Sequence, residues 1–152
     1  MILNIKYRPA SKSDLEFLLD LRIHTMNAHL TARSLPVSNE AHLQRINYQF
    51  EHALIIEIDK RAIGLLKIVR EANNINLIQI QITPSYQSKG IGRKILNDLI
   101  EEAIESEKTI TLSVLKTNKA KNLYSNIGFM IVVETDDSYL MVYENYAREK
   151  GF

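Results

Sequence analysis

Two glycines and several basic side chains lie close together in the segment 87–94. Gly90 and Gly92 carry no side chain that would keep an anion away from the backbone, and Lys89 and Arg93 add positive charge. If a helix begins at this point, its first amide groups point toward the same place, where the helix dipole is positive. The pattern therefore favours the binding of a phosphate or pyrophosphate group.

Two well-known phosphate-binding loops do not fit this segment. A dinucleotide-binding fingerprint would need a third glycine at Ile95 and an acidic residue about twenty positions later, where the sequence has Leu112–Val114. A Walker A loop needs the string G-x-x-x-x-G-K-[ST], which the sequence lacks. Taken alone, the glycine pattern is also compatible with a flexible connection before a helix.

The run Ile80–Gly92 resembles the acetyl-CoA motif of the GCN5-related N-acetyltransferases (the GNAT family), in which a strand leads into [QR]-x-x-G-x-[GA] and a helix. A second run, Asn118–Phe129, resembles the other motif of that family: an Asn, a short helix carrying Leu-Tyr, then Gly-Phe entering a strand. The two motifs stand in the family's order, separated by one expected strand. The resemblance extends over nearly the whole chain and fades over 31–49.

The resemblance implies that acetyl-CoA is the co-substrate and that no metal takes part. In this family the coenzyme enters between two diverging strands, and its pantetheine arm bonds to strand backbone as an added strand would. Asn118 is also expected to cap the short helix, and Lys121 to approach the 3′-phosphate, although a solvated charged face explains this lysine equally well. The residues assigned to the coenzyme are Ile80, Ile82, Gln87, Ser88, Lys89, Gly90, Ile91, Gly92, Arg93, Asn118 and Lys121.

Tyr124 is the expected catalytic residue. The resemblance places its hydroxyl near the departing sulfur, where a phenol of pKa about 10 can protonate or hydrogen-bond a thiolate of pKa about 8.5. The alternative is a tyrosine that only packs at the end of the short helix.

The base that removes a proton from the amine stays unassigned. A protonated amine with a pKa of about 10.4 has no lone pair to attack a thioester, so a proton must leave. Family members often carry a carboxylate on the fourth strand, but Gln79 and Gln81 stand there in this sequence. A glutamine could order a water, and the proton could pass to Glu134, Asp136, His24 or solvent.

The acceptor site is expected to form from the first two helices, the polar face of the fourth strand and the last hairpin. An arginine there would bind a substrate carboxylate through two hydrogen bonds, or Arg22 would pair with Asp20 or Glu16 on its own helix. The candidate substrate-binding residues are Arg22, Thr25, Gln79, Gln81 and Glu134.

Hydrophobic periodicity predicts the elements that position these residues. Ser13 and Glu16 form a capping-box pattern at the start of a helix that should run to about Ala28, and Ser38 should cap a second helix. Alternation predicts that Ile78, Ile80 and Ile82 form a core face of one strand, with the glutamines on a polar face. Other expected elements are strands at 2–7, 54–58, 63–69, 110–114, 130–134 and 139–143, a long helix from Ile91, and a short one from Asn118 ended by Gly128.

This element order predicts the α/β (α+β) class and a three-layer arrangement, and the resemblance implies an acyl-CoA N-acyltransferase-like fold. We expect a mixed, mostly antiparallel sheet of about seven strands with about four helices, in one domain over residues 1–152. Nineteen basic and eighteen acidic residues give a net charge of +1, which creates no global field to attract nucleic acid or a membrane. The absence of cysteine and of a leader or spanning pattern indicates a cytoplasmic protein.

The function that these observations predict is acetyl-CoA-dependent N-acetyl transfer to a primary amine of a small molecule or peptide, by direct attack on the thioester. The expected partners are acetyl-CoA and the amine acceptor, and a homodimer is compatible with the sequence. The missing carboxylate keeps one alternative open, a non-catalytic acetyl-CoA-binding sensor or interaction module. A toxin that acetylates aminoacyl-tRNA is disfavoured by the near-neutral charge.

Overall fold

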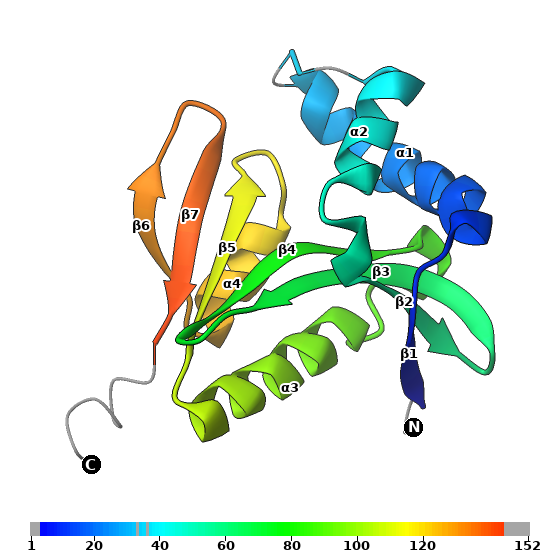
Figure 1. Cartoon of the computed structure of the whole chain (residues 1–152). Helices are drawn as coiled ribbons and strands as arrows, with labels where there is room; N and C mark the ends of the chain where they lie inside the picture. Colours follow the sequence, from blue (N-terminus) through cyan, green and yellow to red (C-terminus); the bar gives the residue numbers. More distant parts are fainter. Residues whose placement is uncertain (1–3, 33, 36, 145–152) are drawn as a thin grey trace. The chain divides into compact units, whose positions relative to one another are not determined.

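The computed structural model describes residues 4–32, 34–35 and 37–144. The chain divides into two compact units: unit 1 comprises residues 1–68 and 79–92, and unit 2 comprises residues 69–78 and 93–152. The strands and α-helices, in chain order (Figure 1), are β1 (Ile5–Pro9), α1 (Leu15–Ala32), α2 (Asn39–Asn47), β2 (Ala53–Ile58), β3 (Arg61–Arg70), β4 (Asn74–Ile82), α3 (Ile91–Ser106), β5 (Thr109–Leu115), α4 (Ala120–Ile127), β6 (Met130–Glu134) and β7 (Ser138–Tyr143).

Seven strands form one sheet in the order β1-β2-β3-β4-β5-β7-β6. The β4–β5 pair is parallel, with a register that runs from Asn74 opposite Thr109 to Leu77 opposite Leu112. The pairs β1–β2, β2–β3, β5–β7 and β6–β7 are antiparallel. A mixed, mostly antiparallel sheet of seven strands with four described α-helices confirms the predicted fold class.

The first strand lies later in the chain than expected. It begins at Ile5 and ends at Pro9, whereas the sequence predicted residues 2–7, of which Ile2 and Leu3 lie outside the described residues. Pro9 pairs with Leu54. Proline is tolerated here because β1 is an edge strand of the sheet, where a missing N–H breaks no ladder bond.

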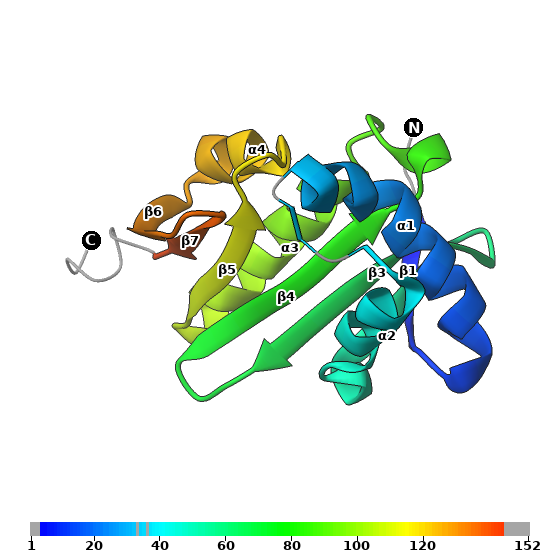
Figure 2. The same cartoon turned by 90° about the horizontal axis from the view of Figure 1, so that it is seen from above.

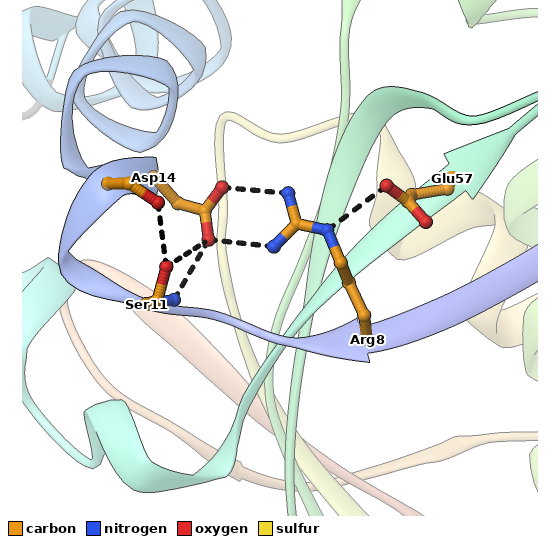
Figure 3. Close-up of polar contacts among 5 residues, drawn as sticks. Arg8, Ser11, Asp14 and Glu57 are labelled. Atoms are coloured by element: carbon orange, nitrogen blue, oxygen red, sulfur yellow. Dashed lines mark hydrogen bonds and ion pairs between the residues drawn. The ribbon is translucent and has the colours of Figure 1, made fainter.

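The start of α1 is held by a different pair of residues from the predicted Ser13 and Glu16. The Asp14 carboxylate accepts the backbone N–H of Ser11 (2.8 Å) and two hydrogen bonds from the Arg8 guanidinium (2.8 and 2.9 Å). Arg8 also donates to Glu57 on β2 (3.0 Å), as Figure 3 shows. A short 3₁₀ turn thus enters α1, and an arginine links that turn to the sheet.

Figure 2 shows α1 and α2 on one side of β3. The core of unit 1 joins these two helices to β2 and β3. Its buried members come from all four elements: Leu18, Leu21, Ile46, Ala53, Ile55 and Leu65. Because Ile55 and Leu65 are directly opposite each other in the β2–β3 register, they share the face that carries the helices. α1 extends to Ala32, one turn beyond the predicted end, and the Ser38 hydroxyl caps α2 as predicted by accepting the N–H of Ala41 (3.1 Å).

Unit 2 buries its own apolar set along α3, β4, β5 and β7. The predicted apolar face of α3 is confirmed, because Ile95, Leu99, Ile100 and Ala103 are all buried, and Leu96 joins them. The other buried hydrophobic residues of this unit are Ile75, Leu77, Ile110, Leu112, Val114, Tyr124, Phe129 and Met141. Buried and more exposed residues alternate along β5, and this alternation specifies the register of the strand.

Replacing Asp14 by alanine should destabilise the protein by about 2 kcal/mol, because a cap and a charge-assisted pair are lost together. Arg8 is partly exposed, so the ion pair itself contributes modestly. Glu16→Ala, at the predicted cap acid, serves as the matched control and should change stability far less.

The Asp14 effect should also depend on pH. Hydrogen bonding to Arg8 lowers the pKa of Asp14 from 3.8 to about 2. The stabilisation is therefore present above pH 3.8 and is lost as the pH falls toward 2. Denaturant unfolding at pH 7 and pH 2.5 checks both statements; equal losses in the Asp14 and Glu16 variants would contradict them.

Candidate functional site

The glycine loop between β4 and α3 presents its backbone to open space. Ser88 and Gly90 have positive φ angles of 61° and 81°, and a Cβ built on Gly90 would meet no heavy atom within 4 Å. The side-chain Nε2 of Gln87 donates to the carbonyl of Ile82 (2.9 Å), which fixes the start of the loop to the end of β4. Ser88 and Lys89 are exposed, and α3 begins at the buried Ile91.

This loop fits a phosphate or pyrophosphate group. The space beside Gly90 is open, and the first amides of the sixteen-residue α3 follow directly in the chain. Gly92 lies in the first turn of α3, and exposed Arg93 follows it. The predicted arrangement of glycine loop, basic side chains and long helix is therefore present in the structure.

The glutamine face of β4 is not a solvent face. A Cβ built on Gly64 would contact the side chains of Ile56 and Ile82, so these two side chains share one face of the sheet. Ile55 and Leu65, which pack against α1 and α2, lie on the opposite face. Gln81 is adjacent to Ile82 in the strand, so the two side chains lie on opposite faces. Gln81 is only 7% exposed, and Gln79 is partly buried. The predicted division into a core face and a polar face is corrected, because Gln81 is buried whereas Ile78, Ile80 and Ile82 are only partly buried.

Gln79 carries a buried oxygen that lacks a partner. Its Oε1 atom accepts no hydrogen bond from any residue in the described part of the chain. A buried acceptor without a donor costs about 1–3 kcal/mol, so such an atom in a folded protein requires an explanation. A bound molecule with an N–H or O–H group would satisfy it.

Arg22 is buried on α1. It does not pair with Asp20 or Glu16, the two partners that the sequence analysis offered as an alternative. Its Nε donates instead to Nδ1 of His42 on α2 (3.0 Å). The other ring nitrogen of His42 lies 2.7 Å from Oδ1 of Asn27. Thr25, the other candidate on α1, donates its hydroxyl to the carbonyl of Leu21 one turn earlier (2.8 Å).

These contacts define the protonation of His42. Because Nδ1 accepts from an arginine, which has no acceptor to offer, Nε2 must carry the proton that it donates to Asn27. Burial and the positive charge of Arg22 lower the pKa of His42, so the ring is neutral at pH 7. Burial, with a smaller effect of Arg45, lowers the pKa of Arg22 to about 10, and this guanidinium remains charged.

Lys67 places a second buried cation in unit 1. Its ammonium group donates to the carbonyls of Arg45 (3.2 Å), Ile46 (3.1 Å) and Tyr48 (2.6 Å) at the C-terminal end of α2. Burial lowers its pKa to about 8, with smaller effects of Arg45 and Arg22. Arg22, Arg45 and Lys67 are thus three cations of unit 1 that interact electrostatically.

In unit 2, the second motif forms the predicted short helix before Gly128, but its N-cap residue is Lys119 rather than the predicted Asn118, and it extends to Ile127. Oδ1 of Asn118 accepts the backbone N–H of Ala120 (2.9 Å) at the start of α4, and Gly128 ends the helix with a φ of 127°. Tyr124 is 7% exposed, and its ring contacts that of Phe129 at a centroid distance of 5.8 Å. Burial raises the pKa of Tyr124 to about 12, so the phenol keeps its proton at any physiological pH.

The remaining polar candidates of unit 2 gather around Tyr139. Lys116 and Lys121 each place Nζ 5.4 Å from the centre of its ring. Lys116 also forms an ion pair with Glu134 (3.1 Å), so Glu134, a candidate base, is held by a cation. In unit 1, another candidate base, His24, is exposed and hydrogen-bonds through Nδ1 to the carbonyl of Asp20 in its own helix (2.8 Å).

Sequence reasoning missed His42, Asn27 and Lys67. A signal for Lys67 was present, because a single lysine interrupts an otherwise apolar run in β3. His42 precedes the buried Ile46 by one helical turn, a spacing that also indicates burial. In the described residues, no group of three metal-binding side chains occurs. None of the helices described is long and apolar enough to cross a membrane.

The seven-stranded mixed sheet and four helices define an acyl-CoA N-acyltransferase-like fold. A sequence model of the acetyltransferase (GNAT) domain matches residues 26–138, and the chain belongs to the GNAT acetyltransferase family.

Solved structures share the fold at low identity. PaiA N-acetyltransferase from Thermoplasma acidophilum, in complex with coenzyme A, is 19% identical with a TM-score of 0.71, covering 93% of this chain and 99% of that chain. The ribosomal-protein-S18-alanine N-acetyltransferase from Escherichia coli is 20% identical with a TM-score of 0.66, covering 92% and 93%. Naa50 from Arabidopsis thaliana, in complex with the bisubstrate analogue CoA-Ac-MVNAL, is 14% identical with a TM-score of 0.63, covering 93% and 99%.

Replacing His42 by asparagine should change how the free energy of unfolding depends on pH. Because the pKa of His42 is lowered in the folded state, the unfolded chain binds a proton near pH 6.5 that the folded protein excludes. Wild-type stability should therefore fall as the pH drops below 6.5, and the variant should lose this component while keeping an acceptor for Arg22. Urea unfolding between pH 5 and 8 measures it, and parallel pH profiles would contradict the neutral, buried ring.

Proposed function

We propose that the protein is an acetyl-CoA-dependent N-acetyltransferase that transfers the acetyl group to a primary amine by direct attack. One observation carries the proposal: the loop before α3 leaves open space beside Gly90 while its backbone takes a positive φ. Family membership and the coenzyme complexes of the structural relatives support it.

The coenzyme-binding residues of the proposal are those of the two motifs. Backbone groups of Ile80 and Ile82 bond to the pantetheine arm, and the amides of the glycine loop bind the pyrophosphate. Gln87 holds that loop to β4 through its bond to the Ile82 carbonyl. The full set is Ile80, Ile82, Gln87, Ser88, Lys89, Gly90, Ile91, Gly92, Arg93, Asn118 and Lys121.

Bound acetyl-CoA supplies the activated carbonyl carbon: a C–N bond forms, the C–S bond breaks, and the amine gives up one proton. The hydroxyl of Tyr124 donates a hydrogen bond to the departing sulfur. Since its pKa is raised to about 12, complete proton transfer to a thiolate of pKa about 8.5 is unfavourable. Its role is therefore to stabilise developing negative charge by a hydrogen bond.

The acceptor side of the proposal uses Arg22, Thr25, Gln79, Gln81 and Glu134. Gln79 offers a buried oxygen to an N–H of the amine or to an ordered water, and a neutral amide cannot itself take a proton. The proton then leaves through water to solvent. Glu134 forms an ion pair with Lys116.

The second candidate function is an acetyl-CoA sensor or interaction module without turnover. The observation that favours it is the pair of glutamines at the fourth-strand positions where many family members have a carboxylate. Binding of the coenzyme without thiol release toward any amine would select it.

Coenzyme binding should raise the melting temperature, and Gly90→Val should weaken binding by about tenfold or more, because a branched side chain displaces hydrogen bonds from loop amides. Gly90→Ala strains the backbone at a positive φ but adds only a methyl group in open space. It therefore shows how much of the loss of affinity comes from backbone strain and how much from the size of the valine side chain. Calorimetry with CoA measures the affinities. Wild-type affinity in Gly90→Val with an unchanged circular dichroism spectrum would remove the loop from the coenzyme site.

Tyr124→Phe keeps the ring and removes the hydroxyl, so CoA affinity should stay nearly constant while kcat falls by up to about a hundredfold. Free-thiol release from acetyl-CoA, with a panel of amino acids, polyamines, aminoglycosides and peptides as acceptors, measures turnover. An unchanged kcat when chemistry limits the rate would leave Tyr124 with packing alone.

A further inference from the structure

We propose that the amine acceptor carries a carboxylate, that Arg22 binds it, and that His42 and Asn27 are positioning residues that orient this guanidinium. The proposal rests on the proposed acetyl transfer and names the chemical class of its acceptor. It concerns residues of unit 1 alone.

The first observation is a buried guanidinium without a counter-ion. Arg22 is 5% exposed, and no carboxylate of the described residues forms an ion pair with it. The charged group that acts on it most strongly is another arginine, Arg45. A buried charge is costly unless it is paired, and a structural role would be served better by a carboxylate partner or an apolar side chain. An anion from outside the chain satisfies the same requirement when it binds.

The second observation is the way in which Arg22 is held. His42 accepts the Nε–H, and Asn27 fixes the tautomer of His42 in which Nδ1 is free to accept. A guanidinium binds a carboxylate through two parallel N–H bonds from one edge. With Nε bonded to His42, the edge formed by the two terminal nitrogens is the one that we assign to the ligand.

The third observation is a buried acceptor atom in the same unit. Gln79 Oε1 is buried and has no donor within the described part of the chain. A ligand with an anionic end and an N–H end satisfies both groups, since the carboxylate pairs with Arg22 and the amine N–H donates to Gln79. Polyamines and aminoglycosides, which carry several protonated amines and no anionic group, can donate to Gln79 but bring further positive charge toward Arg22, Arg45 and Lys67.

The experiment compares amines that differ only in a carboxylate: 6-aminohexanoate with hexylamine, lysine with cadaverine, and tyrosine with tyramine. The first pair matters most, because its carboxylate is too far from the amine to change the amine pKa appreciably. Wild-type protein should use the carboxylated member with a kcat/KM about 10- to 100-fold higher, the range expected for hydrogen bonds to a charged group. Equal values within all three pairs would overturn the proposal.

Variants then assign the preference to Arg22. Arg22→Gln should abolish it chiefly through KM for the carboxylated amines, and Arg22→Lys should keep part of it. Arg45→Gln, which removes a neighbouring exposed arginine, is the matched control and should retain the preference. His42→Asn, which keeps an acceptor beside Arg22, should retain it, whereas His42→Leu should reduce it; identical behaviour of these two variants would overturn the positioning role.

A binding readout separates this proposal from the proposed activity. Calorimetry of 6-aminohexanoate and hexylamine against CoA-loaded protein should show tighter binding of the carboxylate in wild type and equal binding in Arg22→Gln. Arg22-dependent binding without thiol release would reject the transferase and keep the ligand class. Thiol release with no carboxylate preference would do the reverse. If Arg22 variants fail to fold, the wild-type preference and the two His42 variants decide.

Discussion

The ammonium group of Lys67 connects α2 to the strands of unit 1. It lies on β3, it is almost fully buried, and it donates three hydrogen bonds to the last carbonyls of α2. Those carbonyls have no partner within the helix and carry its negative dipole end, so a cation there is favourable. If α2 moved away, a buried charge would lose its partners, which costs several kcal/mol. This requirement fixes where α2 lies, and with it His42.

Polar contacts of the same kind hold the other ends of the helices. Asp14 and Arg8 tie the entry of α1 to β2, and the Arg22–His42–Asn27 chain ties α1 to α2. Apolar packing among Leu18, Ile46 and their neighbours supplies the stabilisation but has little directional preference. The polar groups specify the register of each helix. The candidate site residues Arg22 and His42 therefore lie on helices rather than on loops, an arrangement that favours accurate positioning.

Much of the fold could be predicted because local patterns and burial agree, as in the alternation of β5, the Ser38 cap and the turn at Gly128. The cap of α1 could not, because Ser11 and Asp14 match the capping pattern no better than Ser13 and Glu16. The choice depends on Arg8, which bonds to Asp14 and also to Glu57 on β2, and the local sequence pattern shows neither contact. The burial of Gln81 was missed for a related reason: alternation separates two faces but does not say what covers each of them.

The glutamines of β4 and the cations of unit 1 have a common explanation. A glutamate at position 79 or 81 would place a negative charge in unit 1, which also contains the buried cations Arg22 and Lys67. Opposite charges favour the ionised form of a carboxylate and so weaken it as a base, and a carboxylate that reached Arg22 would compete with an external anion for this guanidinium. A neutral amide leaves the positive charge of Arg22 available and still offers an oxygen to an incoming N–H. The missing carboxylate is therefore consistent with a site that receives negative charge from its substrate.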